Sequence, residues 1–231
     1  MNSNLIITIS IGNRPWFTNI KQYYQLYAKK TNSDFIVIDD NYQGDIQSRL
    51  KKFEIVKYLD KYERILFLDD TCIITPNCPN VFNIVPKELL GVICEKPPFF
   101  NKYHLLKQSL EYYQVADTSN EENHIWFNSG FILFSNVHKQ LFEIPNIPIR
   151  KIGSYLDQAI FNANRYKYNF PIIDLGLRYN YMGTRISEQN PYKINDLDNI
   201  YIYHITRAWS PRKRLSKFNE ILRILTQYSV T

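Results

Sequence analysis

Glycine, cysteine and long apolar runs are all scarce in this chain of 231 residues, and each shortage excludes a class of protein. With 7 glycines and no glycine-rich lysine segment after the first apolar run, the sequence lacks the signature of P-loop proteins and of nucleotidyltransferases on a similar α/β fold. The 3 cysteines form no CxxC pair and no zinc-finger spacing with histidine, so we expect free thiols in a reducing compartment. No run reaches the ~20 apolar residues of a membrane span, and the chain is predicted to be soluble and cytoplasmic.

The composition that is present suits a folded domain. Hydrophobic residues make up 45% of the chain and charged residues 22%, which supports a core and argues against disorder. The net charge of +6 permits an anionic partner, and basic residues gather only near the end of the chain. These are Arg207, Arg212, Lys213, Arg214 and Lys217. Nucleic-acid binding is disfavoured because basic and aromatic residues form no recognisable platform.

Strand-like and helix-like segments alternate in the first part of the chain. Apolar runs at residues 5–10, 35–38 and 64–68 predict strands, and apolar residues at helical spacing between them predict helices. This alternation is typical of a parallel sheet with helices on its faces. Further strands are expected at residues 91–94, 131–134, 171–175 and 200–205, and helices at 102–113, 154–164 and 215–228. We find no repeat or linker, so a single domain is predicted.

Two adjacent carboxylates follow the central apolar run, in the stretch RILFLDDTCIITPNCP at residues 64–79. Acids at the carboxyl end of a central strand lie where open α/β sheets bind their ligands. Hard divalent cations prefer carboxylate oxygen, and magnesium-type ions bind substrate phosphates with only one or two protein carboxylates. Asp69 and Asp70 therefore indicate a cation site, and the alternative is a pair of solvated acids in a strand-end turn.

Several fragments of the chain match one enzyme family in order. They are residues 27–39 (YAKKTNSDFIVID), 52–69 (KFEIVKYLDKYERILFLD), 77–86 (NCPNVFNIVP), 128–131 (NSGF), Asp157-Gln158 followed by Asn162, and 203–204 (YH). With this ordered set the chain resembles the GT-A-fold nucleotide-sugar glycosyltransferases, particularly the glycogenin-like family eight and its bacterial and viral relatives. The resemblance runs from residue 5 to residue 209. It implies a single Rossmann-like GT-A domain over residues 1–231, an α/β fold with a mixed, mostly parallel central sheet flanked by helices. Residues 1–75 would form its nucleotide-binding half, and residues 76–231 its acceptor-side half with the C-terminal helix.

The resemblance also implies a site for a divalent cation. In glycogenin-like enzymes a metal-binding Asp-x-Asp motif ends the central strand and a histidine on a late strand is a further ligand. Here these positions are Asp69, Asp70 and Thr71, with His204 as the histidine, and manganese (Mn2+) or else magnesium (Mg2+) is expected. Thr71 departs from the family pattern, which has an aspartate at this position. Its hydroxyl is a poorer ligand for a hard cation than a carboxylate is. Either Asp70 takes over as ligand, for which the chain must leave strand geometry at that residue, or metal binding is weakened.

Donor-binding and catalytic residues follow from the same resemblance. Asp157 and Gln158, near the start of an expected helix, are the catalytic candidates, and the loop under the sugar is expected at residues 128–130. The candidates for binding the donor are Ser10, Gly12, Arg14, Asp39, Lys52, Asp69, Asn128, Ser129, Gly130 and Arg207. Structural alternatives remain open for several of these candidates. Arg14 also suits a surface charge, residues 128–130 an ordinary turn, and His204 a structural role in its strand. Lys52 also suits a solvated basic helix face, Asp39 a loop or cap, and Asp157 a favourable helix N-terminus.

These features together predict a metal-dependent glycosyltransferase. Its donor would be a nucleotide-diphosphate sugar, with a UDP-sugar favoured, and its acceptor a hydroxyl of a glycan or another molecule. The developing charge on the diphosphate leaving group needs a cation or fixed dipoles placed beforehand. The alternative is a GT-A-fold nucleotide-sugar-binding protein whose catalysis is weakened through Thr71. The sequence leaves open whether the anomeric configuration is retained or inverted.

Overall fold

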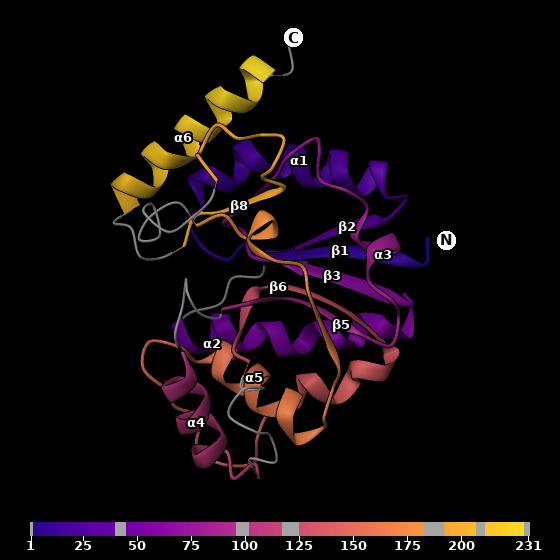
Figure 1. Ribbon diagram of the computed structural model, residues 1–231, viewed down its shortest axis with the longest axis vertical. Coiled ribbons are helices and arrows are strands. Elements are labelled where there is room, and N and C mark those ends of the chain that lie inside the picture. The colour runs from indigo at the N-terminus through magenta and orange to yellow at the C-terminus, as the bar shows by residue number, and fades with distance from the viewer. Residues whose placement is uncertain are drawn as a thin grey trace.

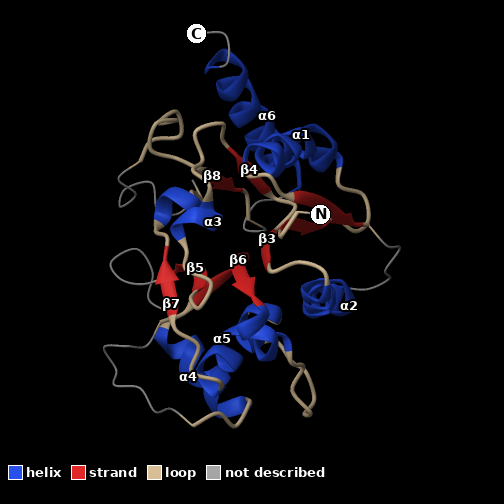
Figure 2. Ribbon diagram, turned by 90° about the vertical axis from the view of Figure 1, so that its right-hand side faces the viewer, coloured by secondary structure: helices blue, strands red, loops and turns tan. Residues whose placement is uncertain are grey.

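A central sheet with helices on both sides organises the molecule (Figure 1). The structure, a computed structural model, describes residues 2–39, 45–95, 102–116, 125–182, 192–206 and 211–228. In Figure 1, α1 (Pro15–Lys30) and α6 (Pro211–Tyr228) lie on one side of the sheet. On the other side are α2 (Asp45–Leu50), α4 (Tyr103–Tyr112) and α5 (Asp157–Lys167). Figure 2 shows the same layers after a quarter turn.

The main sheet has six strands in the order β2-β1-β3-β6-β5-β7. Their bounds are β1 Asn4–Ile9, β2 Asp34–Ile38, β3 Arg64–Leu68, β5 Leu90–Cys94, β6 Phe127–Ser135 and β7 Ile172–Asp174. The pairs β1/β2, β1/β3 and β5/β7 are parallel, whereas β6 runs antiparallel to both β3 and β5. The sheet is therefore mixed and mostly parallel, as predicted. Because β6 is reversed, its first residues lie at the edge where the other strands end.

A second, two-stranded sheet pairs β4 (Cys72–Ile74) with β8 (Ile202–His204) in antiparallel fashion. The remaining elements are short: η1 (Lys51–Asp60), α3 (Val81–Ile84), η3 (Asn136–Phe142) and η4 (Leu177–Tyr179). The helix expected before the central strand is thus a short α-helix that continues as the 3-10 helix η1. The predicted position of the central strand is confirmed, since β3 covers residues 64–68.

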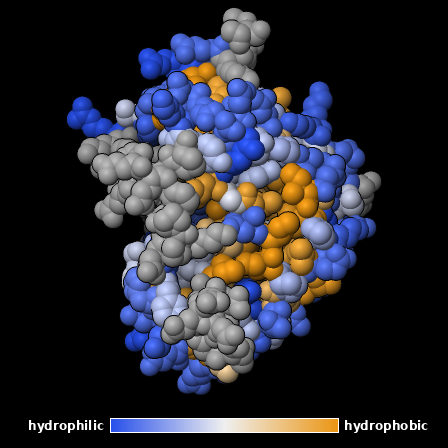
Figure 3. Space-filling view, viewed as in Figure 1, coloured by the Kyte–Doolittle hydropathy of each residue, from blue (hydrophilic) through white to orange (hydrophobic). Residues whose placement is uncertain are grey.

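Alternating side chains of the strands supply a hydrophobic core on each face of the sheet. On β3, Ile65 and Phe67 belong to one cluster and Leu66 and Leu68 to the other, as the period of two in a strand requires. On the surface viewed in Figure 3, hydrophobic side chains gather near the middle and hydrophilic ones surround them. The 3 cysteines are free thiols, as predicted, and the structure shows that all of them are buried. In the part of the chain that the structure describes, no helix is long and apolar enough to cross a membrane.

One predicted loop is wrong. Asn128, Ser129 and Gly130 lie inside the nine-residue strand β6 and are buried, whereas the sequence suggested a loop before a shorter strand. Polar residues are tolerated in a buried strand when partners satisfy them, and the partners here come from other elements of the site. The polar run at residues 117–123, whose composition predicts a loop, lies outside the described residues.

A buried histidine gives the fold a testable pH dependence. His138 in η3 is 0% exposed, and its Nδ1 accepts the backbone N–H of Ser135 at 3.1 Å. Burial lowers the pKa of His138 to about 4. In the unfolded chain the imidazole of His138 takes up a proton near pH ~6.5, whereas in the folded protein it does so only near pH 4. The neutral, buried imidazole therefore contributes stability that is fully present above pH ~6.5 and is lost as the pH falls towards 4. Between these two pH values we expect the free energy of unfolding of the wild type to fall by about 3 kcal/mol more than that of His138→Asn.

Urea unfolding at a series of pH values measures this difference. The control is His104→Asn, which changes an exposed histidine on α4 and is expected to follow the wild type. Equal pH dependence in His138→Asn and the wild type would contradict the prediction.

Candidate functional site

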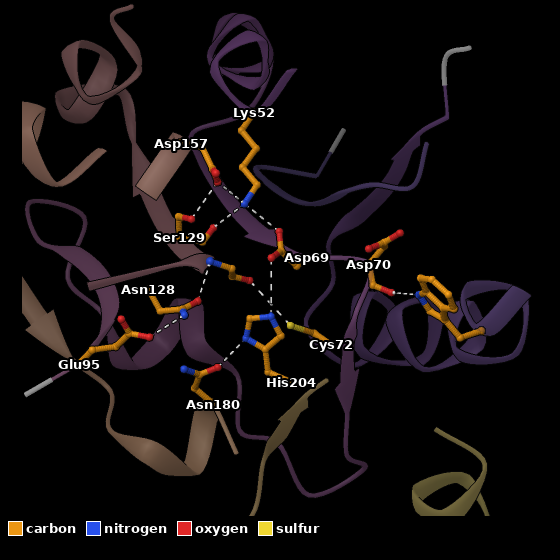
Figure 4. Close-up of polar contacts among 12 residues, drawn as sticks. Lys52, Asp69, Asp70, Cys72, Glu95, Asn128, Ser129, Asp157, Asn180 and His204 are labelled. Carbon is orange, nitrogen blue, oxygen red and sulfur yellow. Dashed lines mark hydrogen bonds and ion pairs between the residues drawn. The ribbon is translucent and has the colours of Figure 1, made fainter. Parts of the chain in front are cut away.

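Asp69 follows β3, and its carboxylate meets side chains from two other parts of the chain, Lys52 and His204 (Figure 4). Its backbone N–H still donates to the Gly130 carbonyl at 2.9 Å, so the residue continues the pairing of β3 with β6. Its carboxylate lies 2.9 Å from Lys52 Nζ through Oδ1 and 3.6 Å from His204 Nε2 through Oδ2. Burial by itself would raise the pKa of Asp69, but Lys52 and then His204 hold that pKa well below its usual range.

Lys52 joins the two carboxylates of the site. Its Nζ lies 2.7 Å from Asp157 Oδ2 and 2.9 Å from Asp69 Oδ1, and it donates to the Ser129 carbonyl at 3.2 Å. Burial by itself would lower the pKa of Lys52, but Asp157 and Asp69 raise that pKa above its usual value. Lys52 is buried on η1, so the alternative of a solvated basic face is wrong for this residue.

Asp157 begins α5, as predicted, and its carboxylate points into the site. Its Oδ2 accepts the hydroxyl of Ser129 at 2.9 Å in addition to the contact with Lys52. Leu156, directly before the helix, and Ala159, two residues after Asp157, are fully buried, which orients the helix so that Asp157 faces β6. Asp157 therefore does more than favour a helix N-terminus.

The ring of His204 is held with its Nε2 towards Asp69. It ends β8, which pairs with β4 so that His204 lies opposite Cys72. Its Nδ1 lies 2.7 Å from Asn180 Oδ1, a contact that fixes the orientation of the ring, and its Nε2 faces Asp69 Oδ2 at 3.6 Å. Metal-binding histidines in proteins are oriented in this way by a second hydrogen bond. The Asp69–His204 pair therefore fits a cation.

Asp70 points away from this pair (Figure 4). Its Oδ2 lies 3.1 Å from Arg14 Nε, and its backbone carbonyl accepts Trp16 Nε1–H at 3.2 Å. Burial raises the pKa of Asp70 to about 6, against the opposing effect of Arg14. Of the 3 predicted metal ligands, the side chains of Asp69 and His204 face each other in space, whereas that of Asp70 faces Arg14. Among the residues that the structure describes, no group of 3 or more His, Cys, Asp or Glu side chains is arranged to hold a metal ion.

Gly130 is required because the site closes around it. A Cβ added there would lie 2.4 Å from His204 Cε1, 2.9 Å from Asn128 Oδ1 and 3.0 Å from Asp69 Oδ2. The Asn128 oxygen also accepts the backbone N–H of Gly130 at 2.8 Å. Only a residue without a side chain lets these groups approach so closely.

Glu95 belongs to the site but was not predicted. Its carboxylate accepts the Asn128 amide at 3.0 Å and the Gln158 amide at 3.0 Å, and it pairs with Lys102. It is 4% exposed and follows the apolar strand β5 directly. The rule that singled out Asp69, an acid at the end of a buried strand, therefore also identifies Glu95.

The other predicted donor-binding residues that the structure describes lie along the same edge of the sheet. Ser10 follows β1, which pairs in parallel with β3, the strand that leads to Asp69. Asp39, which is exposed, follows β2, which pairs in parallel with β1. Gly12 has φ +79°, a conformation that side chains rarely adopt, and open space where a Cβ would be. Arg14 pairs with Asp70. Arg207 lies outside the described residues.

Comparisons with known proteins agree with this architecture. No family model and no curated protein sequence matches the chain. Three solved glycosyltransferase structures, each 12% identical, resemble it in fold. One is described as involved in glycosylation of the major capsid of PBCV-1, with TM-score 0.62, 94% of this chain covered and 98% of that one. The galactosyltransferase LgtC, in complex with donor and acceptor sugar analogs, has TM-score 0.58 with 96% and 95% covered. The bifunctional WbbM has TM-score 0.65, with 97% of this chain but only 50% of that chain covered. The fold is therefore the GT-A fold of glycosyltransferases, and the glycogenin-like subfamily stays a prediction.

Proposed function

We propose that this chain is a glycosyltransferase that moves a sugar from a nucleotide-diphosphate sugar to an acceptor hydroxyl. A fold hosts many activities, so the proposal depends on the site. One observation carries it. At the strand-end edge of a GT-A sheet, Lys52 Nζ lies 2.9 Å from a carboxylate oxygen of Asp69 and 2.7 Å from one of Asp157. Ligands of open α/β sheets bind at this edge.

The side chains present suit a sugar next to a diphosphate. Lys52 holds two carboxylates in fixed orientations and supplies a positive charge in a buried place. Asp157 and Ser129 offer a carboxylate and a hydroxyl, which bind sugar hydroxyls directionally. Gln158 and Asn128, both anchored on Glu95, line the same region with amides. Such preorganised groups stabilise charge that develops during transfer.

Asp69 and His204 are the residues that would hold a divalent cation. When bound, the cation would supply positive charge for the leaving diphosphate. A pair of protein ligands is consistent with an ion that takes its other ligands from substrate phosphates, as magnesium-type ions do. The preference for manganese comes from the sequence resemblance, and an imidazole is an acceptable ligand for that ion. The preference for UDP rests on the sequence resemblance alone.

A second candidate function is nucleotide-sugar binding without catalysis. It is favoured by the ion pair of Asp70 with Arg14 and by Thr71 in the third position of the metal motif. Together these leave the motif with one carboxylate facing His204. A weakened cation site would still permit donor binding.

Thermal unfolding with UDP and manganese tests the proposal. A ligand that binds the native state raises the melting temperature, and we expect UDP with Mn2+ to raise it more than either alone. Asp69→Asn is expected to lose this extra shift. The control is Asp60→Asn, which replaces an aspartate at the end of η1 whose side chain is 80% exposed, and it should keep the shift. No shift with any nucleoside diphosphate would contradict both candidate functions.

Release of UDP from UDP-sugars then separates the two candidates. A transferase is expected to hydrolyse its donor slowly, because water replaces a missing acceptor. Asp157→Ala should suppress that release with little loss of donor affinity. Donor binding without hydrolysis and without transfer to any acceptor would favour the binding protein.

A further inference from the structure

The turn that carries Asp69 and Asp70 has a partner for each of its backbone carbonyls. The Asp69 carbonyl accepts the Cys72 N–H at 2.9 Å, which closes the turn after β3. The Thr71 carbonyl accepts the Ile205 N–H at 2.9 Å, which ties the turn to the segment after β8. The other partners are side chains of helix α1. A turn held at every carbonyl presents its side chains in fixed directions.

Tyr24 of α1 binds the first and last carbonyls of this turn. Its hydroxyl lies 2.7 Å from the Asp69 carbonyl and 2.8 Å from the Cys72 carbonyl, so one proton serves two acceptors. The side chain is 0% exposed, with its ring stacked on Phe35 and edge-on to Phe17. Burial raises the pKa of Tyr24 well above its usual value, which keeps the hydroxyl protonated as a donor.

Trp16, two turns earlier on the same helix, binds the carbonyl of Asp70, which lies between the two carbonyls that Tyr24 binds. Its Nε1–H donates to the Asp70 carbonyl at 3.2 Å, and its ring stacks on Phe218 of α6. With the backbone fixed by Tyr24 and Trp16, the Asp69 carboxylate faces Lys52 and His204, and the Asp70 carboxylate faces Arg14.

We propose that Tyr24 is a positioning residue for Asp69, acting through the backbone of the turn, with Trp16 as its second point of attachment. Tyr24 touches neither Lys52 nor His204 in any contact that the structure records, so its effect on the site must pass through the turn. The catalytic consequence rests on the proposed function. The mechanical coupling between Tyr24 and Asp69 does not.

Thermal unfolding of a set of single and double variants tests the coupling. Asp69→Asn removes a carboxylate that pairs with Lys52. We expect this change, introduced into the wild-type protein, to lower the melting temperature. In the Tyr24→Phe background the same change is expected to cost less than half as many degrees, because the carboxylate is already held less well. Contacting groups show such non-additivity, whereas independent sites add.

Tyr27→Phe is the matched control. Tyr27 is a buried tyrosine of the same helix whose hydroxyl also binds backbone, donating to the Pro79 carbonyl at 2.6 Å, away from the turn. In this background Asp69→Asn should cost as many degrees as in the wild type. Equal costs in all three backgrounds, or no cost of Asp69→Asn in the wild type, would overturn the proposal. If Tyr24→Phe fails to fold, Trp16→Phe, which loses the donor to the Asp70 carbonyl, replaces it in the same comparison.

The UDP and manganese shift provides the functional half of the test. We expect Tyr24→Phe to lose more than half of the extra shift that Mn2+ gives with UDP, and Tyr27→Phe to retain it. A full shift in Tyr24→Phe would overturn the role in the site even if the coupling were found. No shift in the wild type would contradict the proposed function instead, and the double-variant comparison would still decide the coupling.

Discussion

Lys52→Met is expected to lower the free energy of unfolding by about 3–5 kcal/mol at neutral pH and to abolish donor hydrolysis. The ammonium of Lys52 lies 2.7 Å from Asp157 and 2.9 Å from Asp69, and the side chains of Lys52 and Asp157 are only 11% and 9% exposed. Methionine fills the space of the lysine stem but leaves two carboxylates facing each other without a cation. Removing one partner of a buried ion pair is costly because the other charge stays desolvated.

The loss should depend on pH in a direction that identifies its cause. In the wild type the pKa of Asp69 is held below its usual range, so Asp69 contributes stability at neutral pH that is lost in acid. Without Lys52, burial instead favours the protonated carboxyl, and acid relieves the repulsion. The difference in unfolding free energy between Lys52→Met and the wild type should therefore shrink as the pH falls from 7 to 4.

A double variant separates charge from shape. Lys52→Met with Asp157→Asn removes one negative charge together with the ammonium, and we expect it to recover most of the stability at pH 7 but none of the hydrolysis. Lys52→Arg keeps the charge and should fold like the wild type. Urea unfolding and release of UDP measure the two effects. A Lys52→Met protein as stable as the wild type at pH 7 would refute the assigned ion pairs.

The fold was largely predictable because its strands are continuous apolar runs bounded by turn residues. Residues 64–68 are apolar apart from Arg64 and are followed directly by two acids, and the structure has a strand with the same bounds. The start of β6 was not predictable in this way. Asn128, Ser129 and Gly130 have the composition of a turn, and they are strand residues only because Glu95, Asp157 and backbone groups satisfy their polar atoms. Glu95 lies 33 residues from Asn128 and Asp157 lies 28 residues from Ser129 in the sequence.

The site was predictable in its members more than in its directions. Asp69, Lys52, Asp157 and His204 were identified through the ordered resemblance, and they are adjacent in space. The direction of Asp70 was not predictable. Adjacent acids diverge on a regular strand, but after a strand end their directions depend on what binds the turn, and Tyr24 and Trp16 lie about 50 residues earlier in the chain. No local pattern reports such a contact.

Gly130→Ala is expected to reduce donor hydrolysis on the order of 100-fold while leaving the protein folded. The added methyl group would lie 2.4 Å from His204 Cε1 and 3.0 Å from Asp69 Oδ2, so one or both of these side chains must move. Misplacing reacting groups by about 1 Å costs rate of this size. Overpacking of a buried position costs typically about 1–3 kcal/mol of stability, which unfolding in urea measures.

Gly91→Ala is the matched control for this change. Gly91 also lies in the central sheet, on β5, and its added Cβ would lie 3.0 Å from a Val85 methyl and 3.1 Å from Leu133 Cβ, away from the site. It should therefore lose stability but keep hydrolysis and the manganese-dependent shift. In the Gly130→Ala background, His204→Ala removes the ring that the methyl group meets, so this second change should raise the melting temperature, whereas alone it should lower it. A Gly130→Ala protein with wild-type hydrolysis would show that the close approach of β6, His204 and Asp69 has no part in the reaction.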